Sequence, residues 1–338
     1  SLKKYRNFEN NEFICLRTIS YSSSISIKRI ISHFIYCVQV MRYLINTDKD
    51  LIYFIIPPNL LSMIILFGLN NKVKIIVDII DLWPESVPHG NSKLKKTLIK
   101  AGSFFATKIR NLVIKRSTYC ITESEYFYDK LCFYRKKESH VIQIKKINHR
   151  PIENFTTTED LSIAYLGNIG AIYDFSSLFK IIIGLSLERK VILHILGSGP
   201  KKSWFFTKLK QLKIKHVDYG ISFDEARKKD ALAKCWFGFN GYLHDVEVAL
   251  SYKSIDYLSF GIPLINFSKG DIRHLVSSNN IGFNYDIDNI DLIIKQLSKV
   301  KKSDILKLKQ NAYHTFLDKF SEKSYFESMD EIIDKIRF

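Results

Sequence analysis

"LSYKSIDYLSFGIPLIN", from Leu250 to Asn266, joins a polar triplet to an apolar helix and a buried strand. Ser251, Lys253 and Asp256 lie around the first turn of a helix that ends in Gly-Ile-Pro, and an apolar strand follows at once. A helix with a purely structural role needs no such triplet, and unpaired backbone N–H groups at a helix start attract anions. The stretch therefore predicts a helix-to-strand step of an α/β sheet with a ligand at the helix start.

Strand-like and helical segments alternate along almost the whole chain, which is typical of parallel α/β layers. A long amphipathic helix is expected over residues 27–45. Strands are expected over residues 12–19, 51–56, 73–80 and 119–124, and again over 161–167, 191–197, 216–220, 236–240 and 262–267. The fold class predicted is therefore α/β with two Rossmann-like domains that face a cleft. No glycine-rich turn follows an early strand, so we expect the first domain to lack its N-terminal strand.

The segment 148–160, "NHRPIENFTTTED", is polar, contains proline and has no periodicity, so it is the predicted linker. This divides the chain into a first domain over 1–150 and a second over 151–320.

The apolar run from Leu51 to Leu69 approaches the length of a membrane span, but Pro57 and Pro58 would break a spanning helix. We interpret it as a strand followed by a buried helix.

Composition places the protein among folded globular chains. It has 338 residues, 46% hydrophobic and 25% charged, enough for two substantial cores. Five cysteines without metal-ligand spacing predict a reducing compartment, and no signal peptide is visible, so a cytoplasmic location is expected. The cysteines are Cys15, Cys37, Cys120, Cys132 and Cys235.

The positive charge is concentrated in the first half. Residues 1–150 hold 25 Lys/Arg and 11 Asp/Glu, a net of +14, whereas 151–338 hold 26 and 23, a net of +3. Polyanions and acidic lipid headgroups are the usual partners of such a surface. Because no nucleic-acid-binding motif is present, we expect an anionic membrane surface. The basic and apolar helix expected over 93–116 would lie on it.

Glycines follow two strands of the second series. Gly167 and Gly170 come after one strand, and Gly197 and Gly199 after the next. Glycine lets the backbone approach a phosphate closely, and the helix expected next would add its dipole. A plain tight turn is an equal alternative at both places.

These segments, in this order, resemble one family. "YLGNIG" (165–170), "HILGSGP" (194–200), "YGISFDEA" (219–226) and the stretch 250–266 are similar to the C-terminal domain of GT-B glycosyltransferases, in particular the retaining enzymes that build bacterial surface polysaccharides. "VDIIDLWPES" (77–86) resembles an element of their first domain.

The resemblance implies a nucleotide-sugar donor, held by its diphosphate over the glycine turn and by its ribose at an acidic residue, here Asp256. Lys253 and Ser251 are close enough to meet the phosphates. The donor-binding set expected is Gly167, Asn168, Gly170, Gly197, Gly199, Ser222, Glu247, Ser251, Lys253 and Asp256. No cofactor or metal is expected beyond the substrate. In this fold the last helix, here 321–338, returns to the first domain.

The sequence also departs from the family. The usual pair of glutamates separated by seven residues would place its first member at Val248, beside Glu247. The Arg and Lys that follow the glycine turn are replaced by Asn168 and by Tyr173 or Asp174. Phosphate binding would then depend on backbone amides, Asn168 and Lys253.

The first domain offers Asp81 and Glu85 as catalytic candidates at the end of a strand. The function expected is transfer of a sugar from a nucleotide-sugar donor, with UDP as the preferred nucleotide, to a lipid-linked oligosaccharide or polysaccharide at the inner face of the plasma membrane. A non-catalytic glycosyltransferase-like subunit and a UDP-sugar epimerase of the same fold are the alternatives.

Overall fold

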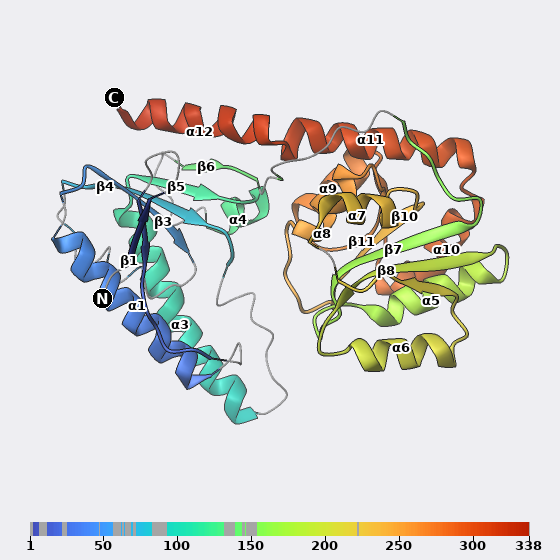
Figure 1. The fold of residues 1–338 in the computed structure, drawn as a ribbon, viewed down its shortest axis with the longest axis horizontal. Coiled ribbons are helices and arrows are strands. Elements are labelled where there is room, and N and C mark those ends of the chain that lie inside the picture. The colour runs from blue at the N-terminus through green and yellow to red at the C-terminus, as the bar shows by residue number, and fades with distance from the viewer. Residues whose placement is uncertain are drawn as a thin grey trace. The chain divides into compact units, whose positions relative to one another are not determined.

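The computed structural model describes residues 3–6, 12–21, 26–46, 48–56, 62, 64, 69, 72–82, 93–131, 139–143, 146, 154–221 and 223–337 (Figure 1). The chain divides into two compact units. One consists of residues 1–122 and 129–140, and the other of residues 123–128 and 141–338. The boundary expected between residues 150 and 151 stays a prediction, as does the docking of the last helix on the first domain.

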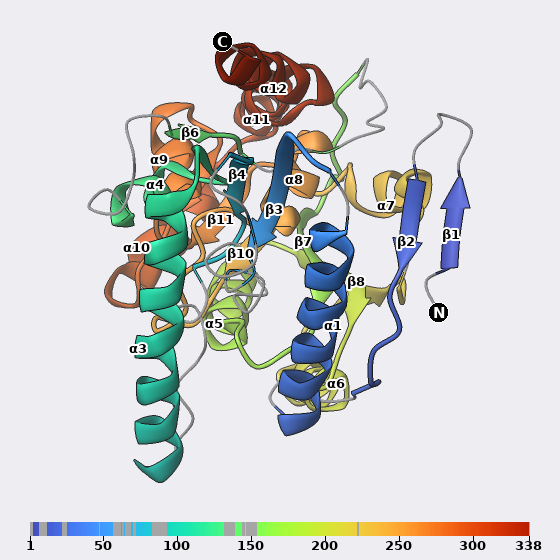
Figure 2. The same ribbon diagram turned by 90° about the vertical axis from the view of Figure 1, so that its left-hand side faces the viewer.

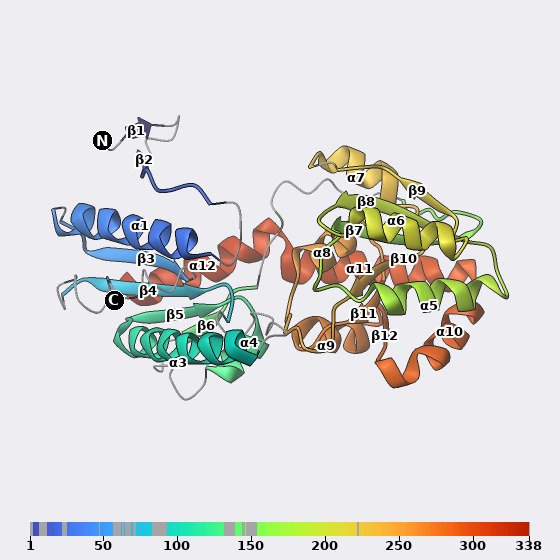
Figure 3. The ribbon, with the colours of Figure 1, turned by 90° about the horizontal axis from the view of Figure 1, so that it is seen from below.

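The first unit contains a four-stranded sheet in the order β3-β4-β5-β6. Its strands are β3 (Leu51–Ile56), β4 (Lys74–Ile79), β5 (Tyr119–Thr122) and β6 (Ser139–Val141). The pairs β3–β4 and β4–β5 are parallel, and alternate residues of β3 are buried, as expected for a strand with one covered face. The helices α1 (Ile27–Ile45) and α3 (Lys93–Arg116) run along this sheet (Figure 3).

The first predicted strand, 12–19, does not join this sheet. Residues Glu12–Cys15 form β2, which pairs in antiparallel fashion with β1 (Lys3–Arg6) as a separate two-stranded ribbon (Figure 2). The helix expected after Ile56 falls mostly outside the described residues. Within the described residues, no helix combines the length and the apolar content that a bilayer crossing requires.

The second unit contains a six-stranded parallel sheet in the order β12-β11-β10-β7-β8-β9. The five strands predicted for this half are present as β7 (Leu161–Asn168), β8 (Val191–Ser198), β9 (His216–Asp218), β10 (Phe237–Gly241) and β11 (Leu264–Phe267). Strand β12 (Gly282–Asn284) was not predicted, because three residues are too few to show a period.

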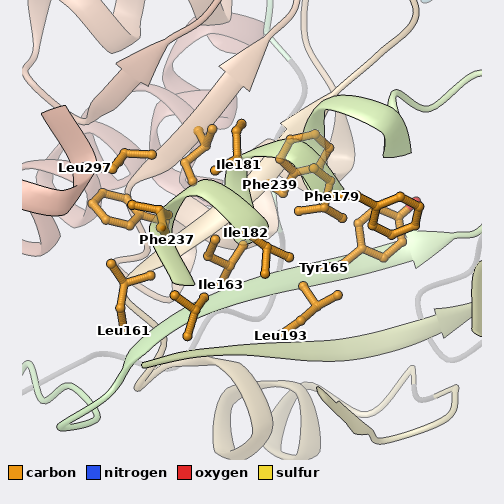
Figure 4. Packing of buried hydrophobic residues seen from close by; sticks show 14 of the residues in the cluster. Leu161, Ile163, Tyr165, Phe179, Ile181, Ile182, Leu193, Phe237, Phe239 and Leu297 are labelled. Atoms are coloured by element: carbon orange, nitrogen blue, oxygen red, sulfur yellow. The ribbon is translucent and has the colours of Figure 1, made fainter. Parts of the chain in front are cut away.

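Helices cover both faces of this sheet because its strands are apolar on both sides. In β7, Ile163 and Tyr165 enter one core cluster and Ala164 and Leu166 enter the other. The first cluster is packed by α5 (Phe175–Ser186), α6 (Lys202–Gln211) and α10 (Ile290–Lys299), the last preceded by a short 3₁₀ turn, η1 (Ile287–Asn289) (Figure 4). The second is packed by α7 (Glu225–Leu232), α8 (Tyr252–Ser259), α9 (Asp271–Ser278) and α11 (Lys302–Phe320). The chain ends in α12 (Glu322–Arg337).

The short helix α4 (Glu125–Lys130) begins in the second unit and is fixed there by a buried carboxylate. The N–H groups of Glu125 and Tyr126 donate to Asp271 at 2.8 and 2.9 Å. The described part of the predicted linker, 154–160, is bound to the same unit, since the indole N–H of Trp236 donates to the carbonyl of Thr158 at 2.9 Å.

Candidate functional site

A pocket of about 590 Å³ lies in the second unit, at the carboxyl ends of β7 and β8 and the start of α8. Ligands of parallel α/β sheets bind at this edge. The lining residues are Leu166, Gly167, Asn168, Ile172, Tyr173, Leu196, Gly197, Ser198, Ile221, Phe223, Lys228, Tyr242, Val248, Ser251, Tyr252, Lys253 and Asp256. Six predicted donor-binding residues therefore line one pocket, although they come from segments almost 90 residues apart.

The glycines at the ends of β7 and β8 allow the two strands to meet. Gly167 pairs with Gly197, and a Cβ atom on Gly197 would lie 2.1 Å from the carbonyl oxygen of Gly167. Gly167 itself has φ +109°, a conformation that other residues rarely adopt. The backbone at these strand ends is therefore bare of side chains where it faces the pocket.

The other two predicted glycines hold the amide of Asn168 in place. A Cβ atom on Gly199 would lie 2.2 Å from Oδ1 of Asn168, and one on Gly170 would lie 2.8 Å from its Nδ2. The hydroxyl of Tyr165 donates to the carbonyl of Asn168 at 2.6 Å. Gly170 and Gly199 thus position a pocket residue and do not line the pocket themselves.

The helix expected directly after Gly170 begins only at Phe175. Its N-cap is Asp174, whose carboxylate accepts from the N–H of Ser177 at 3.1 Å and from the hydroxyl of Tyr285 at 3.3 Å. An acidic cap occupies this helix start and partly offsets its attraction for an anion, and the expected contribution of the α5 dipole to anion binding stays a prediction. An Asp before Phe-Ser-Ser is a cap signal that the sequence did contain.

Ser251 is the N-cap of α8. Its Oγ accepts from the N–H of Ser254 at 3.1 Å and donates to Oδ1 of Asn240 at 3.1 Å. The amide of Asn240 donates to Asn266 at 2.8 Å, and that of Asn266 to Asn284 at 2.7 Å, across three adjacent strands. Because a serine has one O–H, the donation to a phosphate that we expected would require the bond to Asn240 to break.

Lys253 was expected to extend into an open cleft, but its side chain is 7% exposed. Its Nζ lies 3.8 Å from the ring centre of Tyr173, 4.3 Å from that of Tyr165 and 5.7 Å from that of Tyr242. Among the described residues, no hydrogen-bond acceptor reaches this amine. These three tyrosines were not predicted as site residues, since their positions in the sequence give no sign that their rings converge.

Burial and the aromatic rings act on this amine in opposite directions. A cation over an aromatic face gains about 0.5 to 2 kcal/mol, whereas burial of an unpaired ammonium costs several kcal/mol. Burial therefore lowers the pKa of Lys253 well below its ordinary value. Lys253 is also the second residue of α8, where the helix dipole disfavours a positive charge.

Asp256 lines the pocket, but two lysines already bind its carboxylate. Nζ of Lys146 lies 2.7 Å from Oδ1, and Nζ of Lys228 lies 3.4 Å from Oδ2. Glu225 joins both lysines, at 2.5 and 2.6 Å. Burial favours a raised pKa for Glu225, but the hydrogen bonds and charges of the two lysines outweigh it and lower that pKa. Burial likewise opposes the charge of Lys228, whose pKa is nevertheless raised by Glu225 and Asp256.

The mouth of the pocket carries exposed apolar side chains. Ile221 is 58% exposed, Phe223 89% and Tyr252 72%. Large apolar side chains this exposed are typical of ligand-contacting surfaces. The sequence placed Ile221 and Phe223 in the family motif 219–226 without giving either a role.

The remaining candidates contribute less. Glu247 is half-buried beside the pocket-lining Val248 and does not line the pocket itself. Ser222 and Glu85 lie outside the described residues. Asp81 follows β4 in the first unit and is half-buried. The described residues contain no group of three or more His, Cys, Asp or Glu arranged to hold a metal ion.

No protein-family model matches the chain, and no curated protein sequence matches it. Solved structures do resemble it. TarM of S. aureus, solved with UDP, superposes with a TM-score of 0.62 at 13% identity, covering 97% of this chain and 61% of TarM. The lipopolysaccharide outer core galactosyltransferase WaaB superposes with a TM-score of 0.60 at 16% identity, and the match covers 93% of this chain and 82% of WaaB.

HepE of Anabaena, solved with UDP, gives a TM-score of 0.66 at 11% identity, with 88% of this chain and 82% of HepE covered. This chain thus spans about three fifths of TarM and about four fifths of the other two. Identities this low establish the fold alone. The expected architecture of two Rossmann-like domains is confirmed, and the chain has the GT-B fold.

Proposed function

We propose that this protein is a glycosyltransferase that moves a sugar from a nucleotide-sugar donor, preferably UDP-linked, to a lipid-linked oligosaccharide or polysaccharide in cell-surface glycan synthesis. The observation that carries the proposal is the pocket, which is lined by two bare glycine strand ends and by Lys253, whose buried amine has no hydrogen-bond partner within the described residues. Structures of the same fold that contain UDP or UDP-glucose support this choice of donor.

Each part of the donor has a matching group in the pocket. The backbone of Gly167 and Gly197 allows close approach of the diphosphate, and Lys253 supplies a positive charge. A carboxylate has about four lone-pair sites, so Asp256 keeps acceptor capacity for a ribose hydroxyl beyond its two lysine contacts. The apolar rim at Phe223 and Tyr252 suits the planar base.

The chemical step is assigned to the first unit. Asp81 follows a parallel strand, and Glu85 belongs to the same family-like segment. We assign to these carboxylates the orientation of an acceptor hydroxyl or of the donor sugar, in a retaining hexosyl transfer. Replacement of Asp81 by Asn should lower transfer while leaving donor binding unchanged, and a loss of donor affinity would contradict this division of roles.

We place the protein at the inner face of the plasma membrane, as a peripheral protein. Phe104, Phe105 and Leu112 of α3 are more than half exposed, and Lys108 lies over the ring of Phe104 at 4.4 Å. Apolar residues among basic ones are expected at an anionic lipid interface. Replacement of Lys95, Lys96 and Lys100 by Glu should reduce sedimentation with anionic vesicles; sedimentation equal to that of the parent would contradict the proposal.

The second candidate function is a non-catalytic glycosyltransferase-like subunit. It is favoured by Val248, an apolar residue that lines the pocket where the family pattern has a glutamate. A thermal-shift panel of UDP-, GDP-, ADP- and dTDP-sugars, followed by hydrolysis and transfer assays, separates the two. An enzyme should be stabilised by one donor and release its nucleotide, because a bound ligand stabilises the folded state. Stabilisation without turnover would favour the subunit, and absence of stabilisation by every donor would contradict the enzyme.

A further inference from the structure

Lys253 lines the pocket, and its amine is a buried polar group with no hydrogen-bond acceptor among the residues that the structure describes. Three tyrosine rings surround it, from β7, from the turn before α5 and from the end of β10: Tyr165, Tyr173 and Tyr242. A buried polar atom without a partner is rare in folded proteins, and such an atom commonly belongs to a functional site or binds a water or an ion.

The groups around this amine do not supply a counter-charge. The tyrosines are neutral at physiological pH, and burial raises the pKa of Tyr165 and Tyr173 further. On the same helix, the carboxylate of Asp256 is bound by Lys146 and Lys228. Lys228 of α7, which lines the pocket, is itself a cation. A protonated Lys253 would therefore be buried without an anion, at the positive end of α8.

A diphosphate in the pocket reverses this balance. It brings two negative charges and several acceptor oxygens to a site of low polarity, where an adjacent opposite charge strongly favours the protonated amine. The rings then favour the same state, because their faces attract a cation. The surroundings that disfavour the ammonium in the empty pocket thus favour it once an anion is bound.

We propose that the Lys253 amine is uncharged in the free protein and takes up a proton when the diphosphate of a nucleotide-sugar donor binds, so that donor binding is coupled to the uptake of one proton. This inference rests on the proposed function of the pocket. The proton comes from solvent and forms a third N–H bond on the amine, and no other bond changes. Burial of Lys253, which lowers its pKa well below the ordinary value, agrees with the geometry.

The coupling has a defined sign. Because binding consumes a proton, donor affinity is highest at low pH and falls as pH rises through the range between the pKa of Lys253 in the free and in the bound protein. In that range the slope approaches tenfold in affinity per pH unit. A lysine that is already charged in the free protein, such as Lys228, gives no such slope.

The test measures protons directly, with UDP-glucose as the probe, since its two phosphates are esterified and do not titrate near neutral pH. Calorimetric titrations at pH 8 in phosphate and in Tris, which differ in ionisation enthalpy, give the number of protons taken up. We expect close to one for the unaltered protein, close to zero for Lys253→Met, and close to one for Lys228→Met, which removes a charged lysine of the same pocket.

The possible results of this experiment test the proton uptake separately from the proposed glycosyltransferase function. Binding of UDP-glucose to the unaltered protein without proton uptake would overturn the inference and leave the proposed function standing. Equal proton uptake by Lys253→Met would also overturn it, because another group would be the acceptor. Absence of binding by UDP-glucose and by the wider nucleotide-sugar panel would overturn both. The measurement on the unaltered protein decides the matter even if Lys253→Met fails to fold.

Discussion

Two lysines are buried in the second unit, and they are buried in opposite ways. Lys309 of α11 is 0% exposed, and its amine donates to the carbonyl of Ala233 at 2.6 Å. Ala233 is the C-cap of α7, the end at which a helix dipole favours a positive charge. Lys253 of α8 is 7% exposed, lies at a helix start and donates to no group in the part of the chain that the structure describes.

The difference shows which lysine serves the fold. Lys309 satisfies a carbonyl that the end of α7 would otherwise leave unpaired, so its burial is offset by a bond that the folded chain needs. Lys253 satisfies nothing in the protein, and its burial costs stability unless something enters the pocket. We interpret Lys309 as structural and Lys253 as a group whose partner is a ligand.

The largest effect on stability is expected when Asp256, which lies on the same helix as Lys253 and is bound by two lysines, is replaced by alanine. Asp256→Ala removes one of the two carboxylates that bind Lys146 and Lys228, whose side chains are 10% and 13% exposed, and leaves Glu225 as the other. Removal of one partner from a largely buried ion pair costs about 3 kcal/mol of unfolding free energy. Urea unfolding should show this loss, and a smaller one for Asp256→Asn, which keeps one acceptor oxygen.

The matched control is an exposed ion pair of the same unit. Lys180 and Asp291 are 52% and 83% exposed, so Asp291→Ala should change the unfolding free energy by at most about 0.5 kcal/mol. Equal losses for Asp256→Ala and Asp291→Ala would show that burial does not separate the two pairs.

The second expected effect concerns Lys309 and pH. Burial lowers the pKa of Lys309 to about 8 in the folded protein, while the unfolded chain keeps the ordinary value of 10.5. Between these values the unfolded state binds more protons, so stability rises with pH. Relative to Lys309→Met, the unaltered protein should gain about 2 kcal/mol of unfolding free energy between pH 7 and pH 9.5.

The comparison with Lys309→Met is needed because other groups titrate in the same range. Burial raises the pKa of the Cys235 thiol to about 12, which lowers stability as pH rises above 9. The charge of Lys309 lowers the pKa of this thiol, so removing Lys309 raises that pKa further. Up to pH 9.5 the folded thiol is protonated in both proteins, and its contribution nearly cancels in their difference. A difference that stays constant from pH 7 to pH 9.5 would mean that the Lys309 amine is charged in the folded protein throughout.

The smallest expected effect has the opposite sign. Lys253→Met replaces an unpartnered amine by an apolar side chain of similar length, so the unfolding free energy at pH 7 should rise by about 1 kcal/mol. Lys309→Met should lower it, because the carbonyl of Ala233 loses its donor. If both variants are destabilised alike, the contrast between a structural and a ligand-binding lysine fails.

The sequence predicted the second unit better than the first. All five strands predicted there are present. Four of them are buried apolar runs separated by helices, whereas β9 is an exposed edge strand of three residues. The strand expected over 12–19 was wrong in its partner, since four residues with little burial pattern do not reveal whether they join a sheet or a ribbon. The three-residue β12 was too short to predict.

The pocket was predicted in its backbone and not in its side-chain contacts. Glycines after strands are local features, so Gly167 and Gly197 could be placed from the sequence pattern, whereas Lys253 was placed by its helix start together with the resemblance to the family. The rings around Lys253 and the lysines on Asp256 come from residues as many as 110 positions away in the sequence. Contacts between residues this far apart in the sequence depend on the tertiary fold, so no local sequence pattern predicts them.

The central claim is that the amine of Lys253 faces the phosphates of a donor, and the most direct measurement compares uridine with UDP. Calorimetry on the unaltered protein and on Lys253→Met gives the affinity of each for both compounds. A lost charged hydrogen bond of about 1.5 to 3 kcal/mol corresponds to a loss of about tenfold to more than a hundredfold for UDP, with little change for uridine. Equal losses for uridine and UDP, or no loss for UDP, would contradict the assignment.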